Sequence, residues 1–126
     1  MLVLKVGDSV RVKNGVLDPD LSIDIGGWHG RVQELDGEET VHIMWDSVTL
    51  RQMGMSLVIR CENENLDWRV MTLDQSEVES ATERDSEHDV AAAVREITIM
   101  EILLGRTSVS NEKYLTTILP WGSWCA

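Results

Sequence analysis

Alternation of apolar and polar residues in the first three-fifths of the chain constrains its fold more than any other feature. Three segments show it, at residues 8–13, 30–35 and 40–45. In the third segment, Val41 and Ile43 share one side while the residues between them lie on the other. Successive side chains of a β-strand point to opposite faces, so this pattern predicts strands with one buried face.

Turn signals and the lengths of the connections indicate that these strands belong to one small β domain. Asp36 and Gly37 predict a tight hairpin, because glycine tolerates a positive φ. Residues 68–73 are a fourth strand candidate, and residues 56–61 suit a helix and a strand equally. Short strands, a long first loop and a tight second hairpin predict a mainly β fold, a small SH3-like β-barrel over residues 1–75.

The composition changes after this unit. Residues 76–89 contain six acidic residues against one basic residue, Arg84, and one large aliphatic residue, Val78. Segments with so much charge and so little apolar surface rarely form a core. This stretch is therefore predicted to be a solvated acidic linker.

A helical C-terminal extension is predicted for residues 90–126. Ser86 suits the N-cap of its first helix, and Gly105 suits the C-terminal stop. The last turns are apolar nearly all round, so the helix has to be buried on the barrel, in a homo-oligomer through residues 90–104, or on a partner. A second short helix is predicted at residues 110–119, before Pro120.

The loop after the first predicted strand is rich in carboxylates. Its alternating oxygen-bearing residues are Asp18, Asp20, Ser22 and Asp24. Calcium takes several oxygen ligands, so Asp18, Asp20 and Asp24 are candidate calcium ligands. The pattern departs from an EF-hand, because Ile23 replaces the turn glycine and His29 replaces the final glutamate. The alternative is a solvated turn in which Asp18 or Asp20 caps the local backbone.

The aromatic and nucleophilic residues point to binding rather than catalysis. Trp28, His29 and Trp45 are candidate binding residues, although Trp28 also suits loop packing. The glycines around Trp28 lack the Lys-Ser/Thr of a phosphate-binding loop. No spacing joins His29 or Cys61 into a nucleophile and base pair, so no enzyme is predicted. Asp46 or Ser47 is predicted to cap the turn after the third strand.

Net charge and cysteine content restrict the partners and the cellular compartment that we expect for this chain. The 126-residue chain has a formal net charge of −11, which disfavours a nucleic-acid partner. It contains no run of about 18 apolar residues and no signal-peptide pattern, so no membrane association is expected. Cys61 and Cys125 are far apart in sequence and lack metal-binding spacing, which suggests free thiols in the reducing cytoplasm.

Four stretches together resemble a known family. They are "GDSVRVKNGVLDPD", "IGGWHGRV", "IMWDSVTL" and "CENENLDW". They look like motifs of small, often uncharacterised bacterial proteins that are frequent in cyanobacteria, and the resemblance covers about residues 5–75. The resemblance implies an SH3-like barrel. Some members carry a calcium-binding label, which would fall here on Asp18, Asp20 and Asp24.

These observations lead to one expected function and one alternative. The expected function is a non-enzymatic interaction module without a cofactor, which binds a protein or peptide partner or self-associates through its C-terminal helix. The alternative is a calcium-binding domain.

Overall fold

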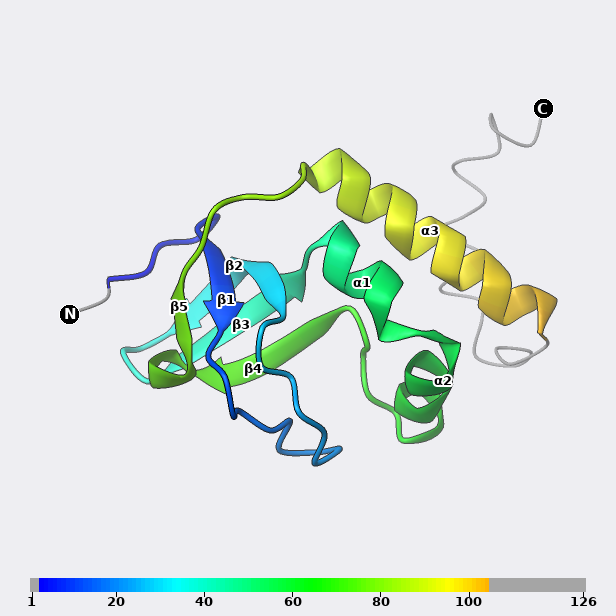
Figure 1. Ribbon diagram of the computed structural model, residues 1–126, viewed down its shortest axis with the longest axis horizontal. Helices are drawn as coiled ribbons and strands as arrows, with labels where there is room; N and C mark the ends of the chain where they lie inside the picture. The colour runs from blue at the N-terminus through cyan, green and yellow to red at the C-terminus, as the bar shows by residue number, and fades with distance from the viewer. Residues whose placement is uncertain (1–2, 105–126) are drawn as a thin grey trace.

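A five-stranded antiparallel sheet and three α-helices make up the fold in the computed structural model, which describes residues 3–104 (Figure 1). The strands are β1 (Ser9–Val12), β2 (His29–Asp36), β3 (Thr40–Trp45), β4 (Val70–Asp74) and β5 (Val78–Ser80), in the spatial order β4-β3-β2-β1-β5. The helices are α1 (Ser47–Met53), α2 (Met55–Asn63) and α3 (Glu87–Leu103), with a short 3-10 helix, η1 (Gln75–Glu77). The chain is thus a mixed α/β fold dominated by its sheet.

The alternating segments form strands, as the sequence predicts. In β3, Val41, Ile43 and Trp45 are buried and the residues between them are half-buried. The predicted hairpin joins β2 to β3, and Gly37 has a φ of +66° in its turn. The fourth strand also forms, shifted to Val70–Asp74. The apolar pattern therefore predicts which side of the sheet faces the core.

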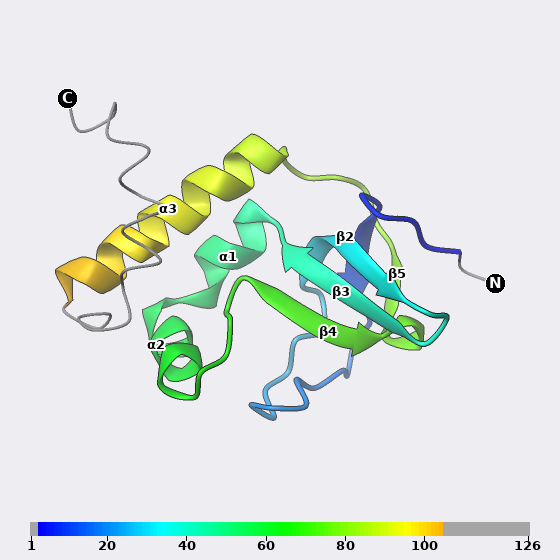
Figure 2. The ribbon, with the colours of Figure 1, turned by 180° about the vertical axis from the view of Figure 1, so that it is seen from behind.

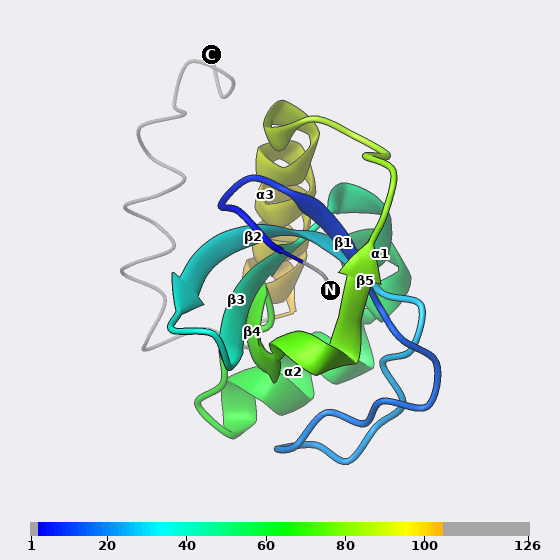
Figure 3. The same ribbon diagram turned by 90° about the vertical axis from the view of Figure 1, so that its left-hand side faces the viewer.

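The predicted closed barrel is not confirmed, because the sheet is open. β4 and β5 are its two edges, and no ladder pairs them within residues 3–104. Instead, η1 spans the gap between them. The Gln75 N–H donates to the Glu39 carbonyl at 2.7 Å, and the Lys13 N–H donates to the Glu77 carbonyl at 2.9 Å. Figure 3 shows the strands curving around a common interior.

The prediction of a solvated linker over residues 76–89 is wrong for part of that range. β5 lies within it and pairs antiparallel with β1, with Val78 opposite Val12. Val78 is buried in the core. A strand of three residues needs one inward-facing apolar side chain, and that is too little to change the composition of an acidic segment.

Two of the three helices confirm predictions, and the third helix was not predicted from the sequence. Residues 56–61 lie in α2, so the helical alternative holds there. α3 begins after Ser86, whose side chain accepts from the Asp89 N–H in a capping box. α1 was not predicted as a helix, but Asp46 caps its start by accepting from the Thr49 N–H at 2.8 Å.

α3 packs on its own chain, and mainly on α1 (Figure 2). Val90 and Ala93 are its apolar contributions to the core. The loop from β1 to β2 lies on the opposite side of the molecule from α3 (Figures 1 and 3). The predicted helix at 110–119 and Cys125 lie outside the described residues. Within the described range, no helix has the length and apolar content that crossing a bilayer requires.

Candidate functional site

A small pocket gathers four of the residues that the sequence singled out. It has a volume of about 140 Å³ and lies between the β1–β2 loop, α2 and β4. We call it the tryptophan pocket and define it by Trp28, Trp45, Trp68, Asp18, Asp20 and Asp67. Of the predicted binding and calcium residues, it contains Trp28, Trp45, Asp18 and Asp20. His29 and Asp24 are not part of it.

The aromatic walls of the pocket belong to different parts of the chain. Trp28 is half-buried in the loop, whereas Trp45 on β3 and Trp68 before β4 are buried. The rings of Trp28 and Trp45 meet edge to face, with centroids 5.1 Å apart and an interplanar angle of 83°. Trp68 donates its Nε1–H to Glu62 at 3.1 Å. Trp45 therefore forms part of an interior wall and is not a surface platform, because it lies on the inward side of β3.

Asp18 performs the capping role that the turn interpretation predicted. Its Oδ1 accepts from the backbone N–H groups of Asp20 at 2.8 Å and Leu21 at 3.4 Å. Its carbonyl accepts from the Ser22 N–H at 2.8 Å. The residue is only 3% exposed and faces the pocket. Asp18 therefore places a buried carboxylate at the pocket wall while it holds the turn.

The three candidate calcium ligands do not all line the same pocket. Asp24 lies outside the pocket and accepts from the Gly26 N–H at 2.9 Å, which makes a separate turn. Within residues 3–104, no three side chains of His, Cys, Asp or Glu gather closely enough to hold a metal ion. The acidic loop is thus divided into two local turns.

Cys61 lies at the pocket wall and is buried. Burial, followed by the charges of Asp18, Glu64 and Glu62, raises its pKa to about 11. The opposing effect of Arg60 is smaller than that of each of these carboxylates. The thiol therefore stays protonated at neutral pH, and the electrostatic potential around it is negative.

His29 follows Trp28 in the chain, at the start of β2, but it does not line the tryptophan pocket. Its backbone N–H donates to the Thr49 hydroxyl at 3.1 Å. Partial burial, followed by the positive charge of Arg84, lowers the pKa of its side chain, although Asp46 opposes this effect. His29 is therefore mostly neutral at physiological pH, and it belongs to a different polar region.

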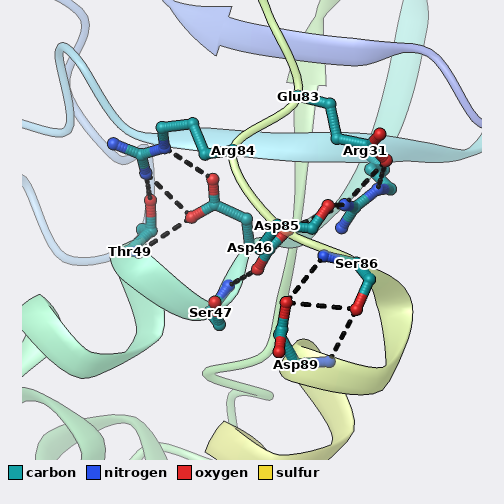
Figure 4. Close-up of polar contacts among 9 residues, drawn as sticks. All are labelled: Arg31, Asp46, Ser47, Thr49, Glu83, Arg84, Asp85, Ser86 and Asp89. Carbon is teal, nitrogen blue, oxygen red and sulfur yellow. Dashed lines mark hydrogen bonds and ion pairs between the residues drawn. The ribbon is translucent and has the colours of Figure 1, made fainter.

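That region is a network that we call the polar clasp, formed by Arg31, Asp46, Glu83, Arg84 and Asp85 (Figure 4). Arg84 donates to both carboxylate oxygens of Asp46 at 2.8 Å. Arg31 pairs with Glu83 at 2.9 Å and with Asp85 at 2.7 Å. The clasp thus ties the segment before α3 to β2 and to the start of α1.

Asp85 is the central member of the clasp. Besides Arg31, it accepts from the Ser47 backbone N–H at 2.6 Å, at the first residue of α1. Burial alone would raise its pKa, but the hydrogen bonds from Ser47 and Arg31 outweigh burial and hold the pKa below its usual value. The sequence assigned this carboxylate to a solvated linker, because composition does not reveal which charges will meet partners.

A larger apolar groove lies between α3 and the sheet. It has a volume of about 440 Å³. Its lining residues define the α3 groove: Val6, Val32, Met44, Val90, Val94 and Thr98, together with Gly7, Ala91 and the polar Arg31, Gln33, Glu87 and Arg95. Sequence reasoning missed it, because the groove exists only where a helix from residues 87–103 lies over strands from residues 29–45.

Comparison with known proteins adds no assignment: the sequence matches no protein-family model, and searches of curated proteins and of solved structures gave no significant match. The function is therefore argued from the geometry of the two pockets.

Proposed function

We propose that this chain is a non-enzymatic interaction module whose α3 groove holds an apolar peptide segment of a partner protein. The groove itself is the observation that carries the proposal. Its volume of about 440 Å³ lies in the range of about 300–1,000 Å³ that is usual for ligand sites. The apolar side chains of its lining, which come from α3 and the sheet, suit a peptide that inserts apolar side chains, and the charged Arg31, Glu87 and Arg95 also line it.

The polar clasp supports this proposal by fixing one wall of the groove. It anchors the residues just before α3, so the helix begins at a set position over β2. A wall that is already in place reduces the conformational entropy that a partner must remove on binding. The groove is therefore suited to binding without rearrangement of the fold.

The thiol of Cys61 and the imidazole of His29 are the groups best suited to catalysis, and their placement favours a binding role over an enzymatic one. Cys61 is buried and protonated, and His29 lies in another region, beside the clasp. A nucleophile needs a base within hydrogen-bonding reach. The net charge of −11 further favours a neutral or basic protein partner in the cytoplasm over a nucleic acid.

For the fold, we infer an open relative of the SH3-like barrel. The strand order, with the two edges joined by η1, supports this inference. The curvature of the sheet is consistent with it (Figure 3). Such barrels bind ligands in their loops and at their edges, which agrees with a binding role.

Self-association is a second candidate, favoured by the exposed end of α3. Leu103 is 74% exposed, and Met100 and Leu104 are also exposed. Contiguous exposed apolar side chains often mark contact surfaces. Light scattering tests this candidate: Leu103→Glu should reduce the mass of any oligomer, and a monomeric wild-type chain at all concentrations would contradict it.

Two valines near the N-terminus provide a matched test of the groove. Val6 lines the α3 groove and is 67% exposed, whereas Val3 does not line it and is 76% exposed. Neither substitution should affect folding, because both side chains are on the surface. Apolar peptides selected against the full chain by display should bind Val6→Glu at least about tenfold more weakly than wild type.

Calorimetry of the selected peptides gives the readout. Val3→Glu adds the same charge at a neighbouring position and should change the affinity less than about twofold. If the selected peptides bind wild type, Val6→Glu and Val3→Glu equally well, the groove is not their site and the proposal fails.

A further inference from the structure

The tryptophan pocket has walls that suit a positively charged organic group. Trp28 is half-buried at the pocket, and its ring meets the buried Trp45 edge to face, with the buried Trp68 as a third lining ring. The face of an indole carries negative charge density and attracts cations within about 6 Å. Walls of this kind favour a soft cation over a hydrated metal ion, which requires oxygen ligands.

The charges at the pocket have the matching sign. The Asp18 carboxylate is buried at the wall, and hydrogen bonds from Asp20 and Leu21 occupy its Oδ1. Both of these bonds go to Oδ1, which leaves Oδ2 as the oxygen that can face a ligand. Asp20 adds an exposed carboxylate at the pocket's edge.

The two arginine side chains near the pocket, Arg60 and Arg69, bind other groups of the protein. Arg60 donates to the Leu21 carbonyl and to Glu64, both at 3.1 Å. Arg69 pairs with Asp67 through two contacts of 2.9 Å. Of the three pocket carboxylates, Asp67 is therefore largely neutralised, and the other two keep the potential negative.

The electrostatic environment of Cys61 agrees with the negative charge that Asp18 places at the pocket. Asp18 is the carboxylate with the largest effect on this thiol, whose pKa lies well above the usual value. The same negative potential that disfavours a thiolate stabilises a bound cation. An anionic ligand would meet both this potential and the indole faces, and is disfavoured.

The size of the pocket limits the ligand to a small group. About 140 Å³ is well below the range of about 300–1,000 Å³ that holds a drug-sized molecule. A group of a few heavy atoms fits, with the remainder of the ligand outside. The exposed and half-buried residues at the edge, such as Asp20 and Trp28, leave an entrance.

From these features we propose that the tryptophan pocket binds an alkylammonium group, with the half-buried Trp28 against its methyl groups and Asp18 and Asp20 as its counter-charges. The group belongs either to a methylated lysine side chain or to a free quaternary amine. The pocket is distinct from the α3 groove, so this inference does not depend on the proposed peptide site.

The first test compares a cation with a neutral molecule of similar shape. Tetramethylammonium and choline are titrated into the full chain at constant ionic strength, against 3,3-dimethyl-1-butanol. The tryptophan indole N–H resonances report binding by NMR. The cations should bind at least about tenfold more tightly than the neutral alcohol. Equal affinity for cation and alcohol, or no shift with any of them, would overturn the proposal.

Matched aspartate variants locate the site. Asp18→Asn removes the charge but keeps the Oδ1 acceptor of the turn, and Asp24→Asn makes the same change in the same loop outside the pocket. Asp18→Asn should weaken tetramethylammonium binding about tenfold, and Asp24→Asn less than about twofold. Equal losses would indicate a general charge effect and contradict a site at Asp18. Asp20→Asn, at an exposed position, should give an intermediate loss even if Asp18→Asn fails to fold.

A comparison of peptides with choline distinguishes the two sources of the alkylammonium group. A short peptide with one trimethyllysine is compared with the unmethylated peptide and with free choline. Tighter binding of the methylated peptide than of choline assigns the pocket to a protein side chain, and the reverse assigns it to a free amine. Equal binding of methylated and unmethylated peptides, together with no choline binding, would contradict the proposal. Val6→Glu should leave all of these affinities unchanged, which separates this test from that of the groove.

Discussion

Arg84 binds Asp46 through two parallel hydrogen bonds of 2.8 Å, from Nε to Oδ2 and from Nη2 to Oδ1. The same carboxylate caps α1 by accepting from the Thr49 N–H. Burial alone would raise the pKa of Asp46, but the hydrogen bonds from Arg84 and Thr49 outweigh it and hold the pKa below its usual value. One side chain thus starts α1 and fixes the segment that leads into α3.

Loss of this pairing should destabilise the fold. We expect Arg84→Ala to lower the free energy of unfolding by about 2 kcal/mol, because it leaves a buried carboxylate with fewer partners. Arg51→Ala is the control, since its pair with Glu96 is exposed on both sides, and it should cost less than about 0.5 kcal/mol. Urea unfolding measures both values. Similar losses for the two variants would contradict a structural role for the clasp.

The clasp should also weaken in acid. Asp46 and Asp85 have pKa values below their usual value of 3.8, so their stabilising effect is present above that pH and is lost as the pH falls through the folded-state values. Urea unfolding of wild type and Arg84→Ala between about pH 2 and pH 6 should show the difference shrinking at the acid end. A difference that stays constant across this range would count against the assignment.

Glu101 predicts a second dependence on pH, with the opposite sign. It is fully buried and lies close to Glu62 and Trp68. Burial, followed by the neighbouring Glu62 carboxylate, raises its pKa from 4.5 to about 7. Between these two values the folded state holds a proton that the unfolded state has released. Stability should therefore fall as the pH rises across this window.

Glu101→Gln tests this effect, because it keeps the shape of the side chain and cannot ionise. Urea unfolding should show that the variant lacks the decline and exceeds wild type in stability above about pH 7. Glu96→Gln, at an exposed position on α3, should keep the wild-type profile. An unchanged slope in Glu101→Gln would show that another group titrates.

The addition of a single methyl group at Gly30 should lower the stability of the fold. A Cβ there would lie 2.5 Å from both the Ile43 Cγ2 and the Met44 carbonyl oxygen, on the neighbouring strand. We expect Gly30→Ala to cost about 2 kcal/mol or more, because the hairpin partner must move. Gly37→Ala is the control: its φ is positive but no atom lies within 4 Å, so it should cost about 1 kcal/mol. Thermal unfolding that ranks the two variants the other way would contradict the close approach.

Calcium tests the alternative function. The candidate ligands Asp18 and Asp24 hold separate turns, so we expect millimolar calcium to leave the unfolding temperature unchanged. Calorimetric titration and thermal unfolding of the full chain measure this. Heat of binding together with a thermal shift that Asp18→Asn abolishes would revive the calcium-binding domain.

Local signals in the sequence were sufficient to predict most of the secondary structure. The strands at β1 to β3 follow from alternation, and Ser86 with Asp89 marks the start of α3. α1 escaped prediction because its seven residues are too short to show a clear helical period. β5 escaped because three residues in an acidic segment carry only one apolar signal, Val78.

The candidate sites were less accessible from the sequence. Trp28, Trp45, Asp18 and Asp20 could be selected as unusual residues, but nothing in the sequence showed that they share a pocket with Trp68. The same pattern grouped His29 with the tryptophans, but in the structure His29 does not line their pocket. Residue type indicates what a side chain can do, and the fold decides which other groups are present.

The sequence by itself determined which faces of the strands are apolar, where the hairpin turns and where α3 begins, because these depend on neighbours within a few residues. Only the tertiary structure decided that the sheet stays open, that acidic residues 83 and 85 form a clasp, and that a pocket and a groove exist. These features join residues that are tens of positions apart, and their energies depend on strand pairing and helix packing that no local pattern contains.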